Sequence, residues 1–339
     1  MIITMKRDAD PKKVRGLLDG LETHGVKVFE IIGTTYSVYG LTGDTTGIDD
    51  EAIRAHKCVK KVVRIAEKYK LVGRLLHPED SVIKVGDIPI GGDSKVQVIA
   101  GPCSIENESM LLRIAEQVKE AGATLLRGGA YKPRTSPYAF QGLGTEGIRA
   151  LVKAREVTGM PVVSELMNTD KIDEFEENVD LIQIGARNMQ NFGLLKDLGK
   201  RTTKPIMLKR GFSNTIEEWI MCAEYIVHSG NPNVIFCERG IRTFETQTRN
   251  TLDPSVVQII KQKTHLPIVI DPSHAAGTYK LVEPSSLAAI ATKTDGLMIE
   301  AHDDPENALS DGPQCIKPER LRSIIAKGKK IAEAVGREM

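Results

Sequence analysis

The chain has 339 residues with a formal net charge of +1 at pH 7, and 41% of the residues are hydrophobic. This charge gives no support for nucleic acid or a membrane surface as a partner. Because the longest apolar runs are strand-sized, no transmembrane helix is expected. The length predicts one large domain and one small one. The five cysteines are scattered and odd in number, which fits a cytoplasmic protein without a disulfide framework, and no signal-peptide pattern opens the sequence.

Residues 1–66 predict a small domain with the order βαββαβ, which is that of the ferredoxin-like split fold. Hydrophobic periodicity and turn residues define its elements. The expected strands are Ile2–Lys6, Val26–Ile32, Tyr36–Leu41 and Val59–Ile65, with a turn at Gly33 and helices at Pro11–His24 and Asp49–Ala55. This segment carries no plausible catalytic cluster.

Residues 67–81 predict a charged linker that contains His77-Pro78. The second domain, residues 82–339, then opens with two short β-rich runs, Val82–Val85 and Ile88–Ile90, separated by Gly86-Asp87. This pattern is typical of a β-hairpin.

From Val96 onward, eight short β-rich runs are each followed by a polar loop and an amphipathic segment of helix length. The expected strands are Val96–Ala100, Thr124–Arg127, Pro161–Ser164, Leu181–Ile184, Pro205–Leu208, Val234–Cys237, Pro267–Ile270 and Gly296–Ile299. Eight such units without an antiparallel signal predict a (β/α)₈ TIM barrel. A doubly wound open sheet is the alternative, less favoured because no glycine-rich dinucleotide fingerprint follows the first strand.

Catalytic chemistry in such barrels occurs at the carboxyl ends of the strands, and these ends are unusually polar here. The run Leu126–Ser136 places Arg127, Lys132 and Arg134 in one strand-end loop. Like charges repel, so this cluster predicts a polyanion bound among them. Thr135 and Ser136 could add neutral hydrogen-bond donors. A solvated basic loop is the alternative for this segment taken alone.

The strand-end cations together suit a substrate that carries both phosphate and carboxylate groups. The set comprises Arg127, Lys132, Arg187, Lys209 and Arg239. Gly185 and Ala186 could let a phosphate approach the backbone closely. The alternative is that the cations pair with Glu165 and Glu238, although basic residues outnumber acidic ones there.

A second set offers sulfur, nitrogen and oxygen ligands for a divalent transition metal. It comprises Cys103, His274, Glu300 and Asp311, which are distant in sequence but fall at strand ends one, seven and eight or just beyond, and these strands are neighbours in a closed barrel. Asp271 could orient His274, and His302 could lie behind the ligands or be solvated. Cys103 could instead be a buried small hydrophobe, the interpretation adopted for Cys58, Cys222, Cys237 and Cys315.

Five motifs together resemble the 3-deoxy-D-arabino-heptulosonate 7-phosphate (DAHP) synthases, in particular the short type I subtype with an N-terminal ferredoxin-like regulatory domain. They are Gly101-Pro102-Cys103-Ser104, Lys132-Pro133-Arg134-Thr135-Ser136, Gly185-Ala186-Arg187-Asn188, Asp271-Pro272-Ser273-His274 and Ala308-Leu309-Ser310-Asp311-Gly312. The second is the most specific, and the resemblance covers nearly the whole chain.

The resemblance implies condensation of phosphoenolpyruvate (PEP) with D-erythrose 4-phosphate, the first step of the shikimate pathway to aromatic amino acids. It implies that the five cations hold the phosphate and carboxylate of PEP and that Arg134 and Thr135 hold the phosphate of erythrose 4-phosphate. Ser136, Gly185 and Ala186 are expected to contact substrate as well. The metal would be Mn, Fe, Co, Zn or a similar divalent ion, with Lys132, Cys103 and His274 as catalytic residues.

The same resemblance implies feedback inhibition by tyrosine or phenylalanine through residues 1–66, and a homotetramer is typical of the relatives. Two other functions are weighed against it. A 3-deoxyoctulosonate 8-phosphate synthase would use arabinose 5-phosphate, but there the Lys-Pro-Arg-Thr-Ser run is replaced by an Asn-containing loop. A catalytically silent amino-acid sensor would be free to lose the strand-end residues, which are intact here.

Overall fold

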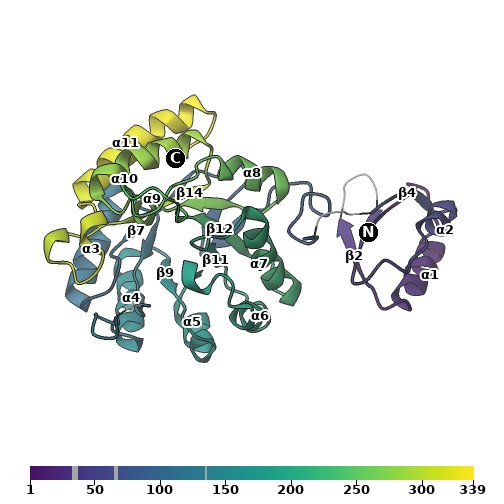
Figure 1. Ribbon diagram of the computed structural model, residues 1–339, viewed down its shortest axis with the longest axis horizontal. Helices are drawn as coiled ribbons and strands as arrows, with labels where there is room; N and C mark the ends of the chain where they lie inside the picture. Colours follow the sequence, from purple (N-terminus) through teal and green to yellow (C-terminus); the bar gives the residue numbers. More distant parts are fainter. Residues whose placement is uncertain (33–36, 65–67, 134–135) are drawn as a thin grey trace. The chain divides into compact units, whose positions relative to one another are not determined.

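The computed structural model describes residues 1–339 except 33–36, 65–67 and 134–135. It divides the chain into two compact units, Met1–Glu79 and Asp80–Met339, and each is described by itself (Figure 1).

The first unit has the predicted βαββαβ order and forms an antiparallel sheet in the order β2-β3-β1-β4. Its elements are β1 (Ile2–Met5), α1 (Pro11–Glu22), β2 (Lys27–Ile32), β3 (Ser37–Thr42), α2 (Asp50–Ala55) and β4 (Val59–Val63). The ferredoxin-like fold is therefore confirmed. The predicted turn at Gly33 and the ends of two expected strands, Tyr36 and Ile65, lie outside the described residues.

Helix α1 illustrates how the local sequence builds this unit. Asp10 accepts a hydrogen bond from the backbone N–H of Lys12 and caps the helix, and Pro11 occupies the first helical turn, where its missing N–H costs nothing. Val14, Leu18 and Leu21 lie at helical spacing and are buried. They pack into one apolar core with residues of the sheet.

The second unit contains a closed barrel of eight parallel strands in the order β7 to β14 (Figure 1). The strands are β7 (Gln97–Gly101), β8 (Leu125–Arg127), β9 (Val162–Glu165), β10 (Leu181–Ile184), β11 (Ile206–Lys209), β12 (Val234–Glu238), β13 (Ile268–Ile270) and β14 (Gly296–Glu300). Parallel pairing of β14 with β7, from Gly296 opposite Gln97 to Glu300 opposite Gly101, closes the barrel. The TIM barrel is confirmed, and the open-sheet alternative is excluded.

Helices surround the strands (Figure 1). They are α3 (Glu108–Ala121), α4 (Thr145–Thr158), α5 (Ile172–Asn178), α6 (Phe192–Arg201), α7 (Ile216–Ser229), α8 (Val256–Lys263), α9 (Pro272–Ala276), α10 (Tyr279–Ala291) and α11 (Pro318–Ala334). Short 3₁₀ turns occur at Thr169–Lys171, Ala186–Asn188, Pro305–Asn307 and Gly312–Gln314. Among the described helices, none combines the length and hydropathy that a membrane span needs.

The predicted hairpin is present as β5 (Ile83–Val85) and β6 (Ile88–Ile90). Its side chains Ile83, Val85 and Ile90 join an apolar cluster with residues from all eight barrel strands. Several of these are at or near the beginnings of their strands, such as Leu125 and Leu181. The hairpin therefore covers the amino-terminal end of the barrel, which leaves the carboxyl end for a site.

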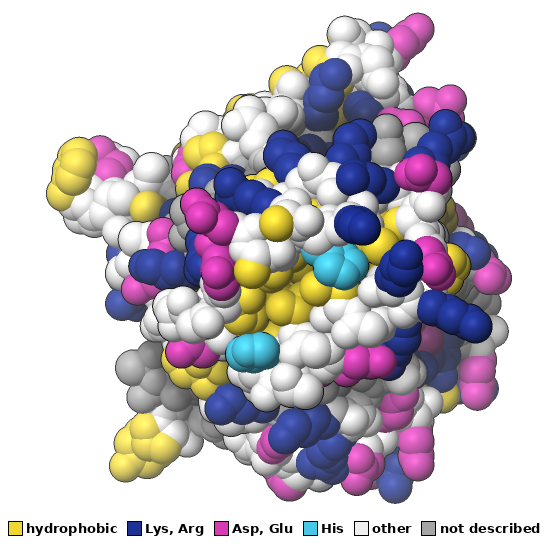
Figure 2. Space-filling view, turned by 90° about the vertical axis from the view of Figure 1, so that its right-hand side faces the viewer, with side chains coloured by type: hydrophobic (Ala, Val, Ile, Leu, Met, Phe, Trp, Pro, Cys, Tyr) yellow, Lys and Arg dark blue, Asp and Glu magenta, His cyan; other side chains and the backbone are white. Residues whose placement is uncertain are grey.

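On the face of the molecule shown in Figure 2, Lys and Arg side chains are interspersed with Asp and Glu side chains, in keeping with the formal net charge of +1.

Candidate active site

A pocket of about 350 Å³ lies at the carboxyl end of the barrel. Its lining includes all five predicted cations and two of the four predicted metal ligands. The residues that matter below are Arg127, Lys132, Glu165, Gly185, Ala186, Arg187, Lys209, Phe212, Arg239, Arg249, His274 and Asp311. Ser136 also lines the pocket, whereas Arg134 and Thr135 lie outside the described residues.

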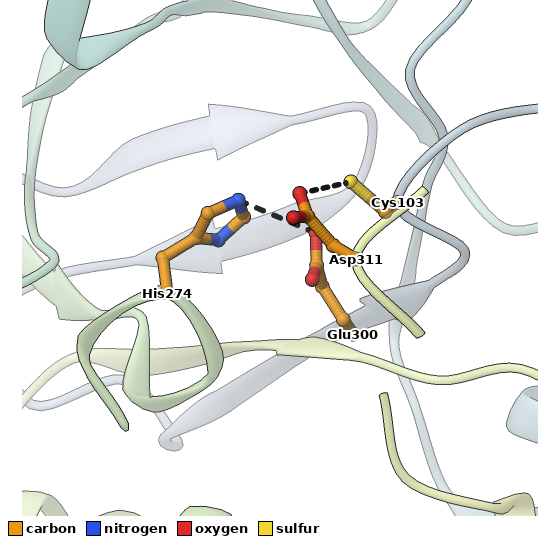
Figure 3. A group of neighbouring side chains, drawn as sticks. All are labelled: Cys103, His274, Glu300 and Asp311. Carbon is orange, nitrogen blue, oxygen red and sulfur yellow. Dashed lines mark hydrogen bonds and ion pairs between the residues drawn. The ribbon is translucent and has the colours of Figure 1, made fainter. Parts of the chain in front are cut away.

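The four candidate metal ligands lie together, although they come from four separate stretches of chain. Cys103 follows β7, His274 lies in α9 after β13, Glu300 ends β14 and Asp311 precedes a 3₁₀ turn. One ligand atom from each falls within 4.8 Å of those of the others. Figure 3 shows the four side chains pointing toward one another.

The contacts within this cluster leave the ligand atoms facing inward (Figure 3). The Cys103 thiol donates to Asp311 Oδ2 at 3.1 Å, and His274 Nε2 lies 3.4 Å from Glu300 Oε1. His274 Nδ1 is held by Asp271 Oδ2 at 2.7 Å, so the imidazole is oriented as Asp271 was expected to orient it. A ring nitrogen fixed in this way presents the other nitrogen to a metal.

The donor set fits a divalent transition ion, because thiolate, imidazole and carboxylate are the ligands such ions take from proteins. In the absence of a cation, burial and then the Glu300 carboxylate raise the pKa of Cys103 to about 12. The thiol is therefore protonated at neutral pH, and metal binding would be coupled to the loss of that proton.

The backbone is unusual at two places in this cluster: at Gly101, two residues before Cys103, and at Asp311 itself. Gly101 has φ +153°, and a Cβ atom there would lie 2.0 Å from the carbonyl oxygen of Arg127, so only glycine allows the close approach of β7 to β8 just before Cys103. Asp311 has φ 54°, a left-handed conformation that aspartate tolerates better than most residues. Both features set the positions of candidate metal ligands, Cys103 and Asp311, through the path of the backbone.

Two further residues hold the cluster from outside. Gln314 Nε2 donates to Glu300 Oε2 at 2.5 Å. Arg249 donates to Gln314 Oε1 at 2.8 Å and to Asp311 Oδ1 at 2.9 Å. The sequence interpretation missed both, because neither residue carries a motif and the contacts of Arg249 span more than 60 positions.

Three of the predicted cations border the cluster of candidate metal ligands. Arg127 pairs with Glu300 at 2.7 Å, and Lys209 pairs with Asp271 at 2.5 Å. Lys132 Nζ donates to Cys103 Sγ and to the Cys103 carbonyl oxygen, both at 3.1 Å. Burial and then Arg127 act to lower the pKa of the Lys132 amine, but the acidic groups Cys103, Glu165 and Glu300 together outweigh them and the pKa is raised. The amine is therefore protonated at neutral pH.

The other two cations, Arg187 and Arg239, have no carboxylate within ion-pairing distance among the described residues. The expected partners are engaged elsewhere: Glu238 pairs with Arg210 at 3.0 Å, and Glu165 accepts from Gln183 at 3.2 Å. The interpretation that Glu165 and Glu238 neutralise the cluster therefore fails for the described part of the chain. The pocket keeps an excess of positive charge.

The side chain of Glu165 leaves no room for a Cβ atom at Gly185, a contact that the sequence did not suggest. A Cβ atom there would lie 1.9 Å from Glu165 Oε1, so the carboxylate itself occupies the space. Ala186 and Arg187 follow in a 3₁₀ turn and line the pocket.

The remaining candidates are also placed. All five cysteines are free and buried, as expected for Cys58, Cys222, Cys237 and Cys315. His302 is only 5% exposed, so its interpretation as a solvated residue is wrong. Its Nδ1 accepts from the backbone N–H of Asp304 at 2.9 Å, which explains why the ring is held in the interior.

Comparison with known proteins finds two family matches, one for the N-terminal part of the chain and one for the rest. Residues 64–337 match the DAHP synthetase I family, and residues 1–67 match the DAHP synthase ferredoxin-like domain. The phospho-2-dehydro-3-deoxyheptonate aldolase of Thermotoga maritima is 47% identical over 336 residues, which cover 99% of each chain. A crystal structure of this enzyme aligns with a TM-score of 0.79 at 46% identity, covering 99% of this chain and 98% of the other.

A second group of enzymes matches a smaller share of the chain. The 2-dehydro-3-deoxyphosphooctonate aldolase of Geobacter sulfurreducens is 33% identical over 270 residues, which cover 74% of this chain and 97% of the relative.

A second structure from the first group also matches. A truncated form of the Thermotoga maritima 3-deoxy-D-arabino-heptulosonate 7-phosphate synthase aligns with a TM-score of 0.74 at 48% identity, covering 80% of this chain and 98% of the other.

Proposed function

The chain belongs to the DAHP synthetase I family, and from this premise we propose that it condenses PEP with erythrose 4-phosphate and water to give DAHP and inorganic phosphate. This is the reaction that commits carbon to the shikimate pathway. The observation that carries the proposal is one pocket in which an excess of cations adjoins a cluster of metal-type ligands.

The cations suit PEP because its enol carbon carries both a phosphate ester and a carboxylate, so two anionic groups lie close together. Arg187 and Arg239 provide guanidinium groups without carboxylate partners among the described residues, and guanidinium binds phosphate and carboxylate through paired donors. Arg127, Lys132 and Lys209 complete the set. The phosphate of erythrose 4-phosphate would be held by Ser136 at the pocket edge, together with Arg134 and Thr135 of the same loop.

Cys103, His274, Glu300 and Asp311 would hold a divalent ion, and the donor set favours Zn, Mn, Fe or Co. When bound, such an ion supplies Lewis acidity to an aldehyde oxygen. Asp271 keeps the imidazole of His274 aimed at the cluster, and Gln314 keeps Glu300 turned toward it.

The bond changes follow from the chemistry of the two substrates. The methylene carbon of PEP attacks the aldehyde carbon of erythrose 4-phosphate, and the protonated amine of Lys132 gives a proton to the aldehyde oxygen. Positive character left at the enol carbon of PEP is quenched by water. Phosphate then leaves with cleavage of the carbon–oxygen bond. Of the two protons that the added water gives up, one goes to the departing phosphate and one replaces the proton donated by Lys132. A fixed array of cations brings together two anions that repel each other in solution.

An isotope experiment tests the proposal. PEP carrying ¹⁸O in the oxygen between carbon and phosphorus is incubated with the metal-loaded protein and erythrose 4-phosphate. Mass spectrometry should find the label in inorganic phosphate and a seven-carbon keto acid phosphate in equal amount. Label retained in the sugar would contradict carbon–oxygen cleavage, and absence of the seven-carbon product would contradict the function itself.

The alternative substrate, arabinose 5-phosphate, is disfavoured by two observations. The run from Lys132 to Ser136 reads Lys-Pro-Arg-Thr-Ser. Residues 1–67 match a DAHP synthase domain, whereas the octonate relative matches 74% of the chain. The silent-sensor alternative is disfavoured because the ligand cluster and the cations are complete.

The first unit, in this proposal, mediates feedback inhibition by tyrosine or phenylalanine. Its match to the ferredoxin-like domain of DAHP synthases supports this role. We further propose a homotetramer, as is typical of the family, working in a reducing cytoplasm that suits five free cysteines.

A further inference from the structure

Phe212 lies in the pocket with three arginine side chains gathered on its ring. The Cζ atoms of Arg187, Arg239 and Arg242 lie 5.5, 4.8 and 4.5 Å from the ring centroid. Phe212 follows β11, while the arginines follow β10 and β12. The backbone N–H of Arg242 also donates to the Phe212 carbonyl oxygen at 2.7 Å, which ties the two loops together beside the ring.

Three guanidinium groups around one ring repel each other, so something must hold them. Arg239 is 3% exposed, and its guanidinium donates to the neighbouring Gly240 carbonyl at 3.1 Å. Arg187 is exposed. Within the residues that the structure describes, neither has the carboxylate partner that Arg127 finds in Glu300.

An aromatic ring differs from a carboxylate in a way that matters for an anion site. A carboxylate would neutralise the guanidinium and compete with an incoming anion. The negative face of a phenyl ring attracts the cation but carries no net charge, so the full positive charge stays available to the ligand.

We propose that Phe212 is a positioning residue, which pre-orders Arg187 and Arg239 for the phosphate and carboxylate of PEP. The inference rests on the proposed function and deepens it. Phe212 need not touch the reacting atoms, and its effect is on binding of PEP rather than on the later bond changes. The aldose phosphate, held by the loop after β8, is not predicted to depend on it.

The test compares Phe212→Leu, which keeps apolar volume but removes the ring face, with Phe212→Tyr, which keeps the face. Titration calorimetry of PEP into the metal-loaded full chain should show the Kd raised about 5- to 30-fold in the Leu variant, the range that ~1–2 kcal/mol of cation–π attraction represents. KM for PEP should rise in parallel. KM for erythrose 4-phosphate and metal affinity should stay unchanged, and the Tyr variant should bind PEP nearly as the parent does.

A matched control is Phe192→Leu, which should leave PEP affinity unaltered. Phe192 lies in α6 and packs at a tilt against Tyr225 of α7, with the ring centroids 4.7 Å apart, and it does not line the pocket. Unchanged PEP affinity in Phe212→Leu would overturn the inference. So would equal losses in the Leu and Tyr variants, or losses of erythrose 4-phosphate and metal binding that match the loss of PEP binding, since these indicate a general structural role. If the parent protein releases no phosphate from PEP with any aldose phosphate, the proposed function fails instead.

Discussion

A single carboxylate joins the cluster of candidate metal ligands to the pocket lined by cations. Glu300 Oε1 accepts from Arg127 at 2.7 Å and lies 3.4 Å from His274 Nε2, while Oε2 accepts from Gln314 at 2.5 Å. Burial opposes ionisation of Glu300, but His274 and Arg127 lower its pKa below the usual value. The negative charge of Glu300 therefore interacts with both His274 and Arg127. Loss of a candidate ligand in this cluster should also disturb the position of Arg127.

Replacing Cys103 by Ala should abolish activity and leave the fold intact. The change removes the only sulfur donor of the described cluster from a buried position. Loss of a residue that only supports a metal ligand already lowers metal affinity or activity about 10–100-fold, so loss of a ligand should have a larger effect. Phosphate release from PEP with erythrose 4-phosphate should fall by more than about 100-fold, with an unaltered circular dichroism spectrum. Normal turnover of the variant in the presence of a chelator would rule out the metal assignment.

Gln314→Ala should weaken metal binding about 10- to 100-fold, because Glu300 and Arg249 both lose the partner that orients them. Competition with a chromophoric chelator measures the metal Kd directly. Gln258→Ala is the matched control, since that exposed glutamine on α8 donates only to the Thr292 carbonyl among its described contacts. Equal metal affinity in the two variants would show that Gln314 has no orienting role.

At the scale of elements, the order of strands and helices was readable from the sequence, while several strand ends were not. Apolar runs identified all eight barrel strands, but the predictions stopped before Glu165, Lys209, Glu238 and Glu300, which the structure includes. A charge normally marks the end of a buried run. Here three of these residues have buried ion-pair partners, as Glu238 has in Arg210 and Lys209 in Asp271. Each strand therefore includes its charged residue as the last one.

The candidate ligands could be predicted because strand ends of a closed barrel converge, whatever their separation in sequence. Phe212, Arg249 and Gln314 could not. Their contacts depend on the paths of loops after β11 and β12 and beyond β14, and loop paths leave no periodicity in a sequence.

The hairpin β5–β6 should contribute stability without contributing to catalysis. Ile90 is fully buried among barrel side chains, at the end of the barrel opposite the pocket. Ile90→Ala should lower the free energy of unfolding of the second unit by ~2–5 kcal/mol, followed through the fluorescence of Trp219, the only tryptophan. Ile88→Ala, at a partly buried position, should lower the free energy of unfolding by less than Ile90→Ala does. KM for both substrates should be unchanged, and equal stability of Ile90→Ala and the parent would refute the role of the hairpin.

At the scale of the whole molecule, the chain joins a unit with its own core to a barrel that carries the complete pocket. If the first unit serves regulation alone, a chain that begins at Ser81 should keep the condensation activity and lose its response to tyrosine and phenylalanine. Initial rates of both forms with each amino acid measure this. Full sensitivity of the shortened chain would place the effector site in the barrel, and loss of activity would make the first unit structural.

We propose that the barrel pocket condenses PEP with erythrose 4-phosphate with the help of a bound metal ion, and an assay of phosphate release can test both parts at once. Phosphate release from PEP is followed with the metal-loaded protein, with erythrose 4-phosphate and arabinose 5-phosphate supplied separately, before and after chelation. We expect release with erythrose 4-phosphate that stops on chelation and returns with added metal. Release only with arabinose 5-phosphate, or release with erythrose 4-phosphate that survives complete removal of metal, would contradict the account.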